Sequence, residues 1–182
     1  MTRGPTLPGH PLPHLPTPLA AFNAAPADEA RALLLCCLRS LRWSDRVTEH
    51  RPYPDLAALL AAADEAAYDL SPADLAEALA GESLPELPAD TYSAAHMALS
   101  AANAAYECKF GHAFVIYLGD VHPDETLDHI LEGIRSRLTN DPEDERVTTA
   151  EELRRLARSR LTAALGAARR SMTSPKAPAS GI

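Results

Sequence analysis

The feature that most constrains the fold is the helical spacing of the apolar residues, which a single segment interrupts. Alanine- and leucine-rich stretches carry apolar residues three and four positions apart, a spacing that places them on one face of an α-helix. Residues 106–119, YECKFGHAFVIYLG, break this pattern, because a glycine is followed there by a short β-branched and aromatic run. The sequence therefore predicts an all-α fold, a single multi-helix domain with one short extended segment near residues 113–118.

Local signals predict where the earlier helices begin and end. Asn23 is expected to cap a helix that has Pro26 in its first turn. Ser71, followed by Pro72 and by Asp74 at the third helical position, is typical of a capping box, and Gly81 is expected to stop that helix. The predicted apolar face of the first helix consists of Ala30, Leu34, Cys37, Leu38 and Leu41.

The later helices are predicted in the same way. A long helix is expected to begin at Asp90 or Thr91 and to end at Gly111. A further helix follows the extended segment, and the last helix is expected to begin at Thr148 or Thr149, because glutamates stand three residues further on.

Composition indicates where the folded part begins and ends. The first 18 residues contain repeated prolines and no apolar periodicity, and the last residues, SMTSPKAPASGI, contain few that could form a core. We expect one domain over residues 19–168, with a disordered proline-rich tail at 1–18 and a disordered tail at 169–182. A chain of 182 residues is of ordinary size for one domain.

Charge and hydropathy exclude several classes of partner. A net charge of −8 argues against nucleic acid, which needs clustered Lys and Arg. No apolar run approaches the roughly 20 residues that span a bilayer, and the start, MTRGPTLPGHPLPH, has no apolar core typical of a secretory signal. We therefore expect no nucleic acid and no membrane among its partners.

The cysteines and histidines suggest neither a disulfide framework nor a metal site. The three cysteines form no CxxC pattern, and Cys36 and Cys37, in the apolar run LLLCCL, are predicted to be small buried hydrophobes. A reduced, cytoplasmic protein is expected on this basis. The seven histidines are dispersed without the spacing of metal ligands, so no metal is expected.

Several local words, taken in order, resemble the 2-oxo-4-hydroxy-4-carboxy-5-ureidoimidazoline (OHCU) decarboxylases of urate breakdown. The resemblance covers nearly all of residues 19–165, and its most specific word is the stretch around KFG. The words are AAFN (20–23), CLRSLRW (37–43), RPYPDLAALLAAAD (51–64), NAAYECKFGHAFVI (103–116), RSRLTNDPEDE (135–145) and LRRLARSRL (153–161).

The resemblance implies a fold and an activity. It implies a compact all-α protein, usually a homodimer, that removes CO2 from a small anionic substrate, OHCU, and leaves (S)-allantoin, with no metal or organic cofactor. It also implies that residues 113–118 form an extended wall whose backbone N–H groups help to hold the substrate. Phe114, Val115 and Ile116 are the substrate-binding residues predicted on this wall.

The chain departs from the family at the catalytic pair, which is a histidine in a word like HPRIG and a glutamate in a later SxxEQ. Residues 78–86 read ALAGESLPE, so Glu82 falls at the histidine position. Residues 93–97 read SAAHM, which places Ser93 at the serine and His96 at the glutamate. Because the stretch between 82 and 103 is shorter than in typical members, the EQ segment could instead be deleted.

Two interpretations of this departure stay open. In the first, histidine and carboxylate have exchanged places, and Glu82 and His96 face each other across the cleft as a catalytic acid/base pair. In the second, Glu82 is a solvated loop residue and His96 is a structural member of a helix face.

Arg160 and Asn103 are the remaining predicted substrate-binding residues. Arg160 lies on the apolar face of the last helix, where its guanidinium needs either a substrate anion or an internal carboxylate. Asn103 shares a helix face with His96 and either orients a substrate amide or bonds to a neighbouring backbone group.

Two functions are therefore predicted. The first is the decarboxylation of OHCU, or of a related ureido-imidazoline, by a carboxy-lyase that uses Glu82, His96 and Arg160. The alternative is a catalytically inactive protein of the same fold that binds or scaffolds a partner of the purine pathway, which the loss of both family words would favour.

Overall fold

A computed structural model describes residues 17–84, 93–119 and 121–173. Within these ranges the chain is helical, with no strand, as the sequence predicted. The elements are α1 (Pro18–Ala24), α2 (Ala27–Cys37), α3 (Leu41–Glu49), α4 (Leu56–Tyr68), α5 (Pro72–Leu79), α6 (Ser93–Phe110), the short 3-10 helix η1 (Pro123–Glu125), α7 (Thr126–Arg137) and α8 (Pro142–Thr173).

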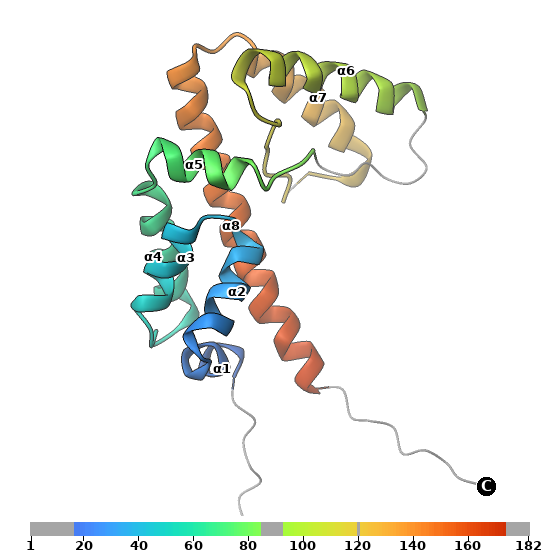
Figure 1. Ribbon diagram of the computed structural model, residues 1–182. Helices are drawn as coiled ribbons and strands as arrows, with labels where there is room; N and C mark the ends of the chain where they lie inside the picture. Colours follow the sequence, from blue (N-terminus) through green and yellow to red (C-terminus); the bar gives the residue numbers. More distant parts are fainter. Residues whose placement is uncertain (1–16, 85–92, 120, 174–182) are drawn as a thin grey trace, which may run out of the picture.

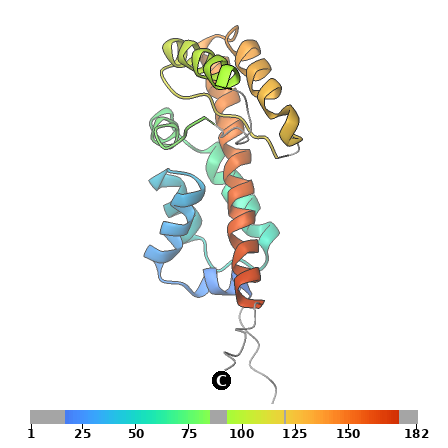
Figure 2. The same ribbon diagram turned by 90° about the vertical axis from the view of Figure 1, so that its right-hand side faces the viewer.

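Helix α8 is the axis of the molecule. It is 32 residues long and runs from the end that carries α6 and α7 to the end that carries α1 (Figure 1). Helices α1, α2 and α4 pack against it, and the view from the side shows the same arrangement (Figure 2). The chain therefore has two helical groups, α1–α5 and α6–α7, that a single long helix connects.

Each helical group has its own core. The larger core surrounds Leu34, Trp43 and Leu59 and includes the apolar face of α8, for example Leu161. The smaller core lies between α6 and α7, where Tyr106 and Ile130 enclose the side chain of Phe114. Since Phe114 belongs to the extended segment, this segment is fastened to the smaller core by an aromatic side chain that is fully buried.

The extended segment begins where the sequence predicted. Helix α6 ends at Phe110, and Gly111 has a φ of 82°, a left-handed conformation that glycine adopts without the steric cost other residues meet. The capping box of α5 is also confirmed, since Ser71 and Asp74 exchange both of their hydrogen bonds. The predicted start of the long helix at Asp90 or Thr91 lies outside the described residues.

Three predictions about the helices are wrong, and two of them concern the first helices. Asn23 lies inside α1 and does not cap a helix, because its side-chain amide bonds both the N–H and the carbonyl of Tyr53. The predicted first apolar face spans two helices, with Leu41 exposed at the start of α3.

The last helix begins seven residues before Thr149. The side chain of Asp141 accepts hydrogen bonds from the N–H groups of Glu143 and Asp144, at 2.9 and 3.0 Å, and Pro142 needs no acceptor. The threonine and glutamate pattern further along resembles a cap but occurs within the helix. Thr149 is buried there, and its hydroxyl donates a hydrogen bond to the Glu145 side chain.

Candidate functional site

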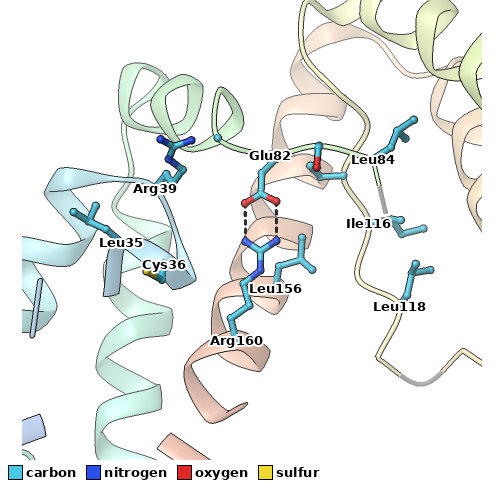
Figure 3. Close-up of a pocket in the computed structure, with 12 residues that line it drawn as sticks. Leu35, Cys36, Arg39, Glu82, Leu84, Ile116, Leu118, Leu156 and Arg160 are labelled. Carbon is cyan, nitrogen blue, oxygen red and sulfur yellow. Dashed lines mark hydrogen bonds and ion pairs between the residues drawn. The ribbon is translucent and has the colours of Figure 1, made fainter. Parts of the chain in front are cut away.

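A cavity of about 610 Å³ lies where both helical groups meet α8. Its wall is made by the C-terminal end of α2 and the turn after it, by the end of α5, by the extended segment and by one face of α8. Figure 3 shows Arg39 and Cys36 on one side and Ile116 and Leu118 on the other, with Glu82 and Arg160 between them. Polar and charged groups therefore line the middle of an otherwise apolar hollow.

Glu82 and Arg160 form a two-pronged ion pair in this cavity. The two guanidinium Nη atoms donate to the two carboxylate oxygens at 2.7 and 2.8 Å (Figure 3). Only 6% of the Glu82 side chain is exposed, against 38% of the Arg160 side chain. The hydrogen bonds to Glu82 raise the pKa of Arg160 above its ordinary value, although partial burial opposes this. The pair is thus well shielded on the carboxylate side and open to the cavity on the arginine side.

The sequence of each partner explains how the pair forms. Glu82 follows directly on Gly81 after the end of α5, so its side chain leaves the helix and turns toward α8. Arg160 lies one helical turn beyond Leu156, which also lines the cavity, and its Nη1 makes a further bond of 3.2 Å to the carbonyl of Cys37. Arg160 therefore joins the ends of α2 and α5 to α8.

The extended segment forms one wall of the cavity next to this pair. Val115, Ile116 and Leu118 line the cavity, whereas the Phe114 side chain is turned into the smaller core. The N–H of Phe114 donates to the side chain of Asn103 at 3.1 Å. The N–H groups of Val115 and Ile116 meet no acceptor within the part of the chain that the structure describes, and both residues line the cavity.

A buried ion pair holds this wall from behind. Arg137 donates to the carbonyl of Val115 at 2.7 Å and to Glu145 through Nε at 2.8 Å and Nη2 at 2.5 Å. Glu145 also accepts hydrogen bonds from the hydroxyls of Tyr106 and Thr149. The wall is consequently positioned by α6, α7 and α8 together, through groups that are nearly all buried.

Burial and hydrogen bonding within this network shift two pKa values. Burial first, and then the hydrogen bond to Glu145, raise the pKa of Tyr106 to about 12. Burial alone would raise the pKa of Glu145, but the hydrogen bonds from Arg137 and Tyr106 outweigh it and lower the pKa. Both shifts stabilise the same state, a neutral phenol beside an ionised carboxylate.

The other predicted site residues lie as follows. His96 is exposed on α6 and is not among the residues that line the cavity, so the structure does not bring it to Glu82. Ser93 is the first residue of α6, and its side chain lies outside what the structure describes. Asn103 has its amide occupied at both ends, since it accepts from Phe114 and donates to Glu107 at 2.8 Å.

Cys36 and Arg39 are cavity residues that the sequence did not indicate. Cys37 is buried as predicted, and burial raises the pKa of its thiol to about 11. Cys36 is exposed and lines the cavity, contrary to the prediction, because it occupies the opposite face of the last turn of α2. Arg39 lies in the turn after α2. No feature of the sequence there separates an arginine that lines a cavity from one on the surface.

The described residues were also compared with what a metal site and a membrane-spanning helix require. They contain no group of three or more His, Cys, Asp or Glu side chains that could hold a metal ion. None of the described helices is long and apolar enough to cross a membrane.

Solved structures with the same all-α fold include two that are described by name. A crystal structure of OHCU decarboxylase in the presence of (S)-allantoin matches with a TM-score of 0.64 and 18% identity, over 78% of this chain and 99% of that one. A crystal structure of (S)-allantoin synthase gives the same TM-score and identity over 80% of this chain, which spans about half (53%) of that longer protein.

The sequence itself assigns the family. The OHCU decarboxylase model matches residues 23–162, from the end of α1 to the middle of α8. The chain belongs to the OHCU decarboxylase family, as the sequence resemblance predicted. No curated protein sequence matches it.

Proposed function

We propose that the chain is a cofactor-free carboxy-lyase that converts OHCU, or a closely related ureido-imidazoline, to (S)-allantoin in urate breakdown. One observation carries the proposal: Glu82, which the sequence resemblance places at the position of the family's histidine, lines a cavity beside the extended wall. An acid/base group is therefore retained where the resemblance implies one, although the residue type has changed.

Glu82 has a defined role in this reaction. Loss of CO2 breaks the bond between the ring carbon and the carboxylate, and the electron pair stays on the ring as an enol or enolate. The Glu82 carboxylate takes the proton of the ring hydroxyl and returns a proton to the ring carbon that becomes stereogenic. Delivery from one wall of the cavity gives one enantiomer, since Glu82 comes from the end of α5 only.

The neighbours of Glu82 orient it and the substrate. Arg160 holds both carboxylate oxygens, at 2.7 and 2.8 Å, so the carboxylate cannot rotate freely. The N–H groups of Val115 and Ile116 are suited to bind the ureido and ring carbonyl oxygens along the wall. The charge that develops on a ring oxygen would be stabilised by such fixed donors.

His96 has no part in this proposal, because its side chain is exposed on α6. We expect His96→Ala to leave turnover unchanged, which separates the present proposal from a Glu82–His96 pair. Homodimer formation and a cytoplasmic location remain predictions from the resemblance and from the sequence.

The direct test generates OHCU from urate with auxiliary enzymes and follows the circular dichroism of the product. The proposal predicts (S)-allantoin at a rate above the spontaneous reaction, with His96→Ala equal to the wild type. An unchanged rate of racemic product with the wild type would overturn it. A loss of about 10²-fold in His96→Ala, the usual scale for a general acid or base, would favour the exchanged pair.

A second candidate, an inactive binding protein, is favoured by a specific observation. Both oxygens of Glu82 are bonded to Arg160, and no histidine occurs among the described residues that line the cavity. Such a protein would bind cyclic ureides and would catalyse nothing. Glu82→His, which places the family's histidine at position 82, should then create turnover that the wild type lacks.

A further inference from the structure

We propose that Arg39 is the cation that captures the substrate's carboxylate. This rests on the proposed function, whose cavity it shares, and it assigns the anion site to a residue other than Arg160. Arg39 comes from the turn between α2 and α3 and lines the same cavity as Glu82 and Arg160, on the side opposite Ile116 and Leu118 (Figure 3).

The first observation is that the charge of Arg160 is already neutralised. Glu82 occupies its two Nη atoms, and the carbonyl of Cys37 accepts a further bond from Nη1. A substrate anion would have to compete with a carboxylate that is held in the geometry arginine prefers. Arg160 is thus a poor site for a second anion while Glu82 is ionised.

The second observation is that Arg39 differs from every other arginine that lines a cavity in the described part of the chain. Each of the others forms an ion pair with a carboxylate; these are Arg46, Arg146, Arg154, Arg155, Arg158 and Arg160. Arg39 forms neither an ion pair nor a side-chain hydrogen bond within the described residues, although it lines the cavity. No described residue therefore neutralises its positive charge.

The third observation is that the position of Arg39 depends on a glycine. A Cβ atom on Gly81 would lie 2.9 Å from both Cβ and Cγ of Arg39 and closer still to Cδ. These are stem atoms, so a side chain at position 81 would displace the whole arginine rather than its tip. Gly81 thus lets the arginine stem cross the end of α5 and reach the cavity next to Glu82.

The charges of the cavity then define its ligand. Glu82 and Arg160 cancel, which leaves one positive charge from Arg39, and the wall of Val115 and Ile116 offers N–H donors for carbonyl oxygens. One carboxylate together with a ureide ring satisfies both features. Arg39 is exposed, so solvent screens its attraction for the anion. The carboxylate is therefore not held rigidly and can still leave as CO2.

Cys36 provides a measurement of binding that needs no turnover. Its thiol lines the same cavity and is exposed, so a bound ligand should shield it from alkylation by iodoacetamide. Cys108, exposed on α6, serves as an internal reference, and Cys37 is buried with a pKa raised to about 11, so it should stay unmodified. Tandem mass spectrometry of the peptides separates the adjacent Cys36 and Cys37.

The experiment compares hydantoin-5-acetate, a cyclic ureide with a carboxylate, with neutral hydantoin. We expect hydantoin-5-acetate to slow alkylation of Cys36 but not of Cys108. Arg39→Met should raise the half-protecting concentration by about tenfold, the scale of one hydrogen bond to a charged group. Arg39→Lys should restore part of this loss, and protection by hydantoin should not change.

Two further variants make the result specific. Gly81→Ala should weaken protection by hydantoin-5-acetate although it removes no charge, because it displaces Arg39. Arg42→Met, which changes an exposed arginine outside the cavity that approaches Asp74 at 3.8 Å, should behave as the wild type.

Equal protection of the wild type and Arg39→Met, or no protection of the wild type by either compound, would overturn the assignment of Arg39. Protection that depends on Arg39 in a protein without OHCU turnover would support the assignment and overturn only the proposed reaction.

Discussion

The molecule contains two arginine–glutamate pairs that differ in what surrounds them. In the Arg137–Glu145 pair the side chains are 9% and 1% exposed, and Tyr106, Thr149 and the Val115 carbonyl occupy further hydrogen-bonding positions. In the Arg160–Glu82 pair the arginine is 38% exposed and the pair faces a cavity of about 610 Å³. The first pair is nearly all buried and is surrounded by hydrogen-bonding groups of the protein, whereas the arginine of the second is open to a large cavity.

This difference in burial separates an ion pair with a structural role from an ion pair with a functional role. A buried pair in which one partner is lost leaves an uncompensated charge in the core, so its variants should act on stability. A pair at a cavity edge is screened by solvent, so its variants should act mainly on binding and turnover. The two pairs are linked through the wall, because Arg137 holds the carbonyl of Val115, and Val115 lines the same cavity as Glu82.

The largest effect on stability is expected from Arg137→Met. It leaves Glu145 buried without its main partner and should reduce the free energy of unfolding by about 3–5 kcal/mol. Urea unfolding followed by circular dichroism measures this. The matched control is Arg135→Met on the same helix, where an exposed arginine pairs with Glu132 and little change is expected. Equal stability of the two variants would show that the network does not hold the core.

An alkaline loss of stability is expected from Tyr106. Its ordinary pKa of 10.0 is raised to about 12 in the folded chain, so its contribution is complete below pH 10 and declines as the pH rises from 10 to 12. Urea midpoints at pH 9 and pH 11 should therefore differ less in Tyr106→Phe than in the wild type. Tyr53, whose pKa burial also raises, is present in both proteins and does not affect the comparison. Identical pH dependence of the urea midpoint in the two proteins would contradict a raised pKa of Tyr106.

A smaller effect, in the direction of gain, is expected from Glu82→Gln on anion binding. Loss of the carboxylate charge releases Arg160, which becomes a second cation in the cavity beside Arg39. Hydantoin-5-acetate should then protect Cys36 at about a tenfold lower concentration, the worth of one charge-assisted hydrogen bond. Unchanged or weaker protection would mean that Glu82 does not mask Arg160.

The smallest effect is expected from Glu82→Gln on stability. With the Arg160 side chain more than a third exposed, solvent screens the pair, and the variant should lose about 1 kcal/mol or less. The same urea titration provides the value. A loss as large as that of Arg137→Met would remove the distinction between the two pairs.

Much of the fold could be predicted because its signals are local. Gly111 and the β-branched run after it indicate a helix end followed by an extended segment, and Ser71 with Asp74 indicates a helix start. The start of the last helix could not be decided from local signals alone. Asp141–Pro142 and Thr148–Thr149 both resemble a helix start, and only the buried network around Glu145 requires Thr149 to lie inside the helix.

The candidate site could be predicted only in part, because it depends on contacts between distant residues. The need of Arg160 for a partner was predicted from its place on an apolar helix face, and Glu82 from its alignment with the family's histidine. Their pairing joins positions 78 residues apart, which no local pattern reveals. Arg39 was missed for the same reason, since its importance comes from Gly81, which follows the end of α5, and not from its neighbours in the chain.

The central claim is that Glu82 performs the proton transfer in a cavity that has kept the family's reaction. It is tested most directly by comparing the formation of (S)-allantoin from OHCU by the wild type and by Glu82→Gln, with circular dichroism as the readout. The wild type should exceed the spontaneous rate, and Glu82→Gln should be slower by about 10²-fold or more while binding hydantoin-5-acetate at least as well. Equal rates in the two proteins would contradict the claim.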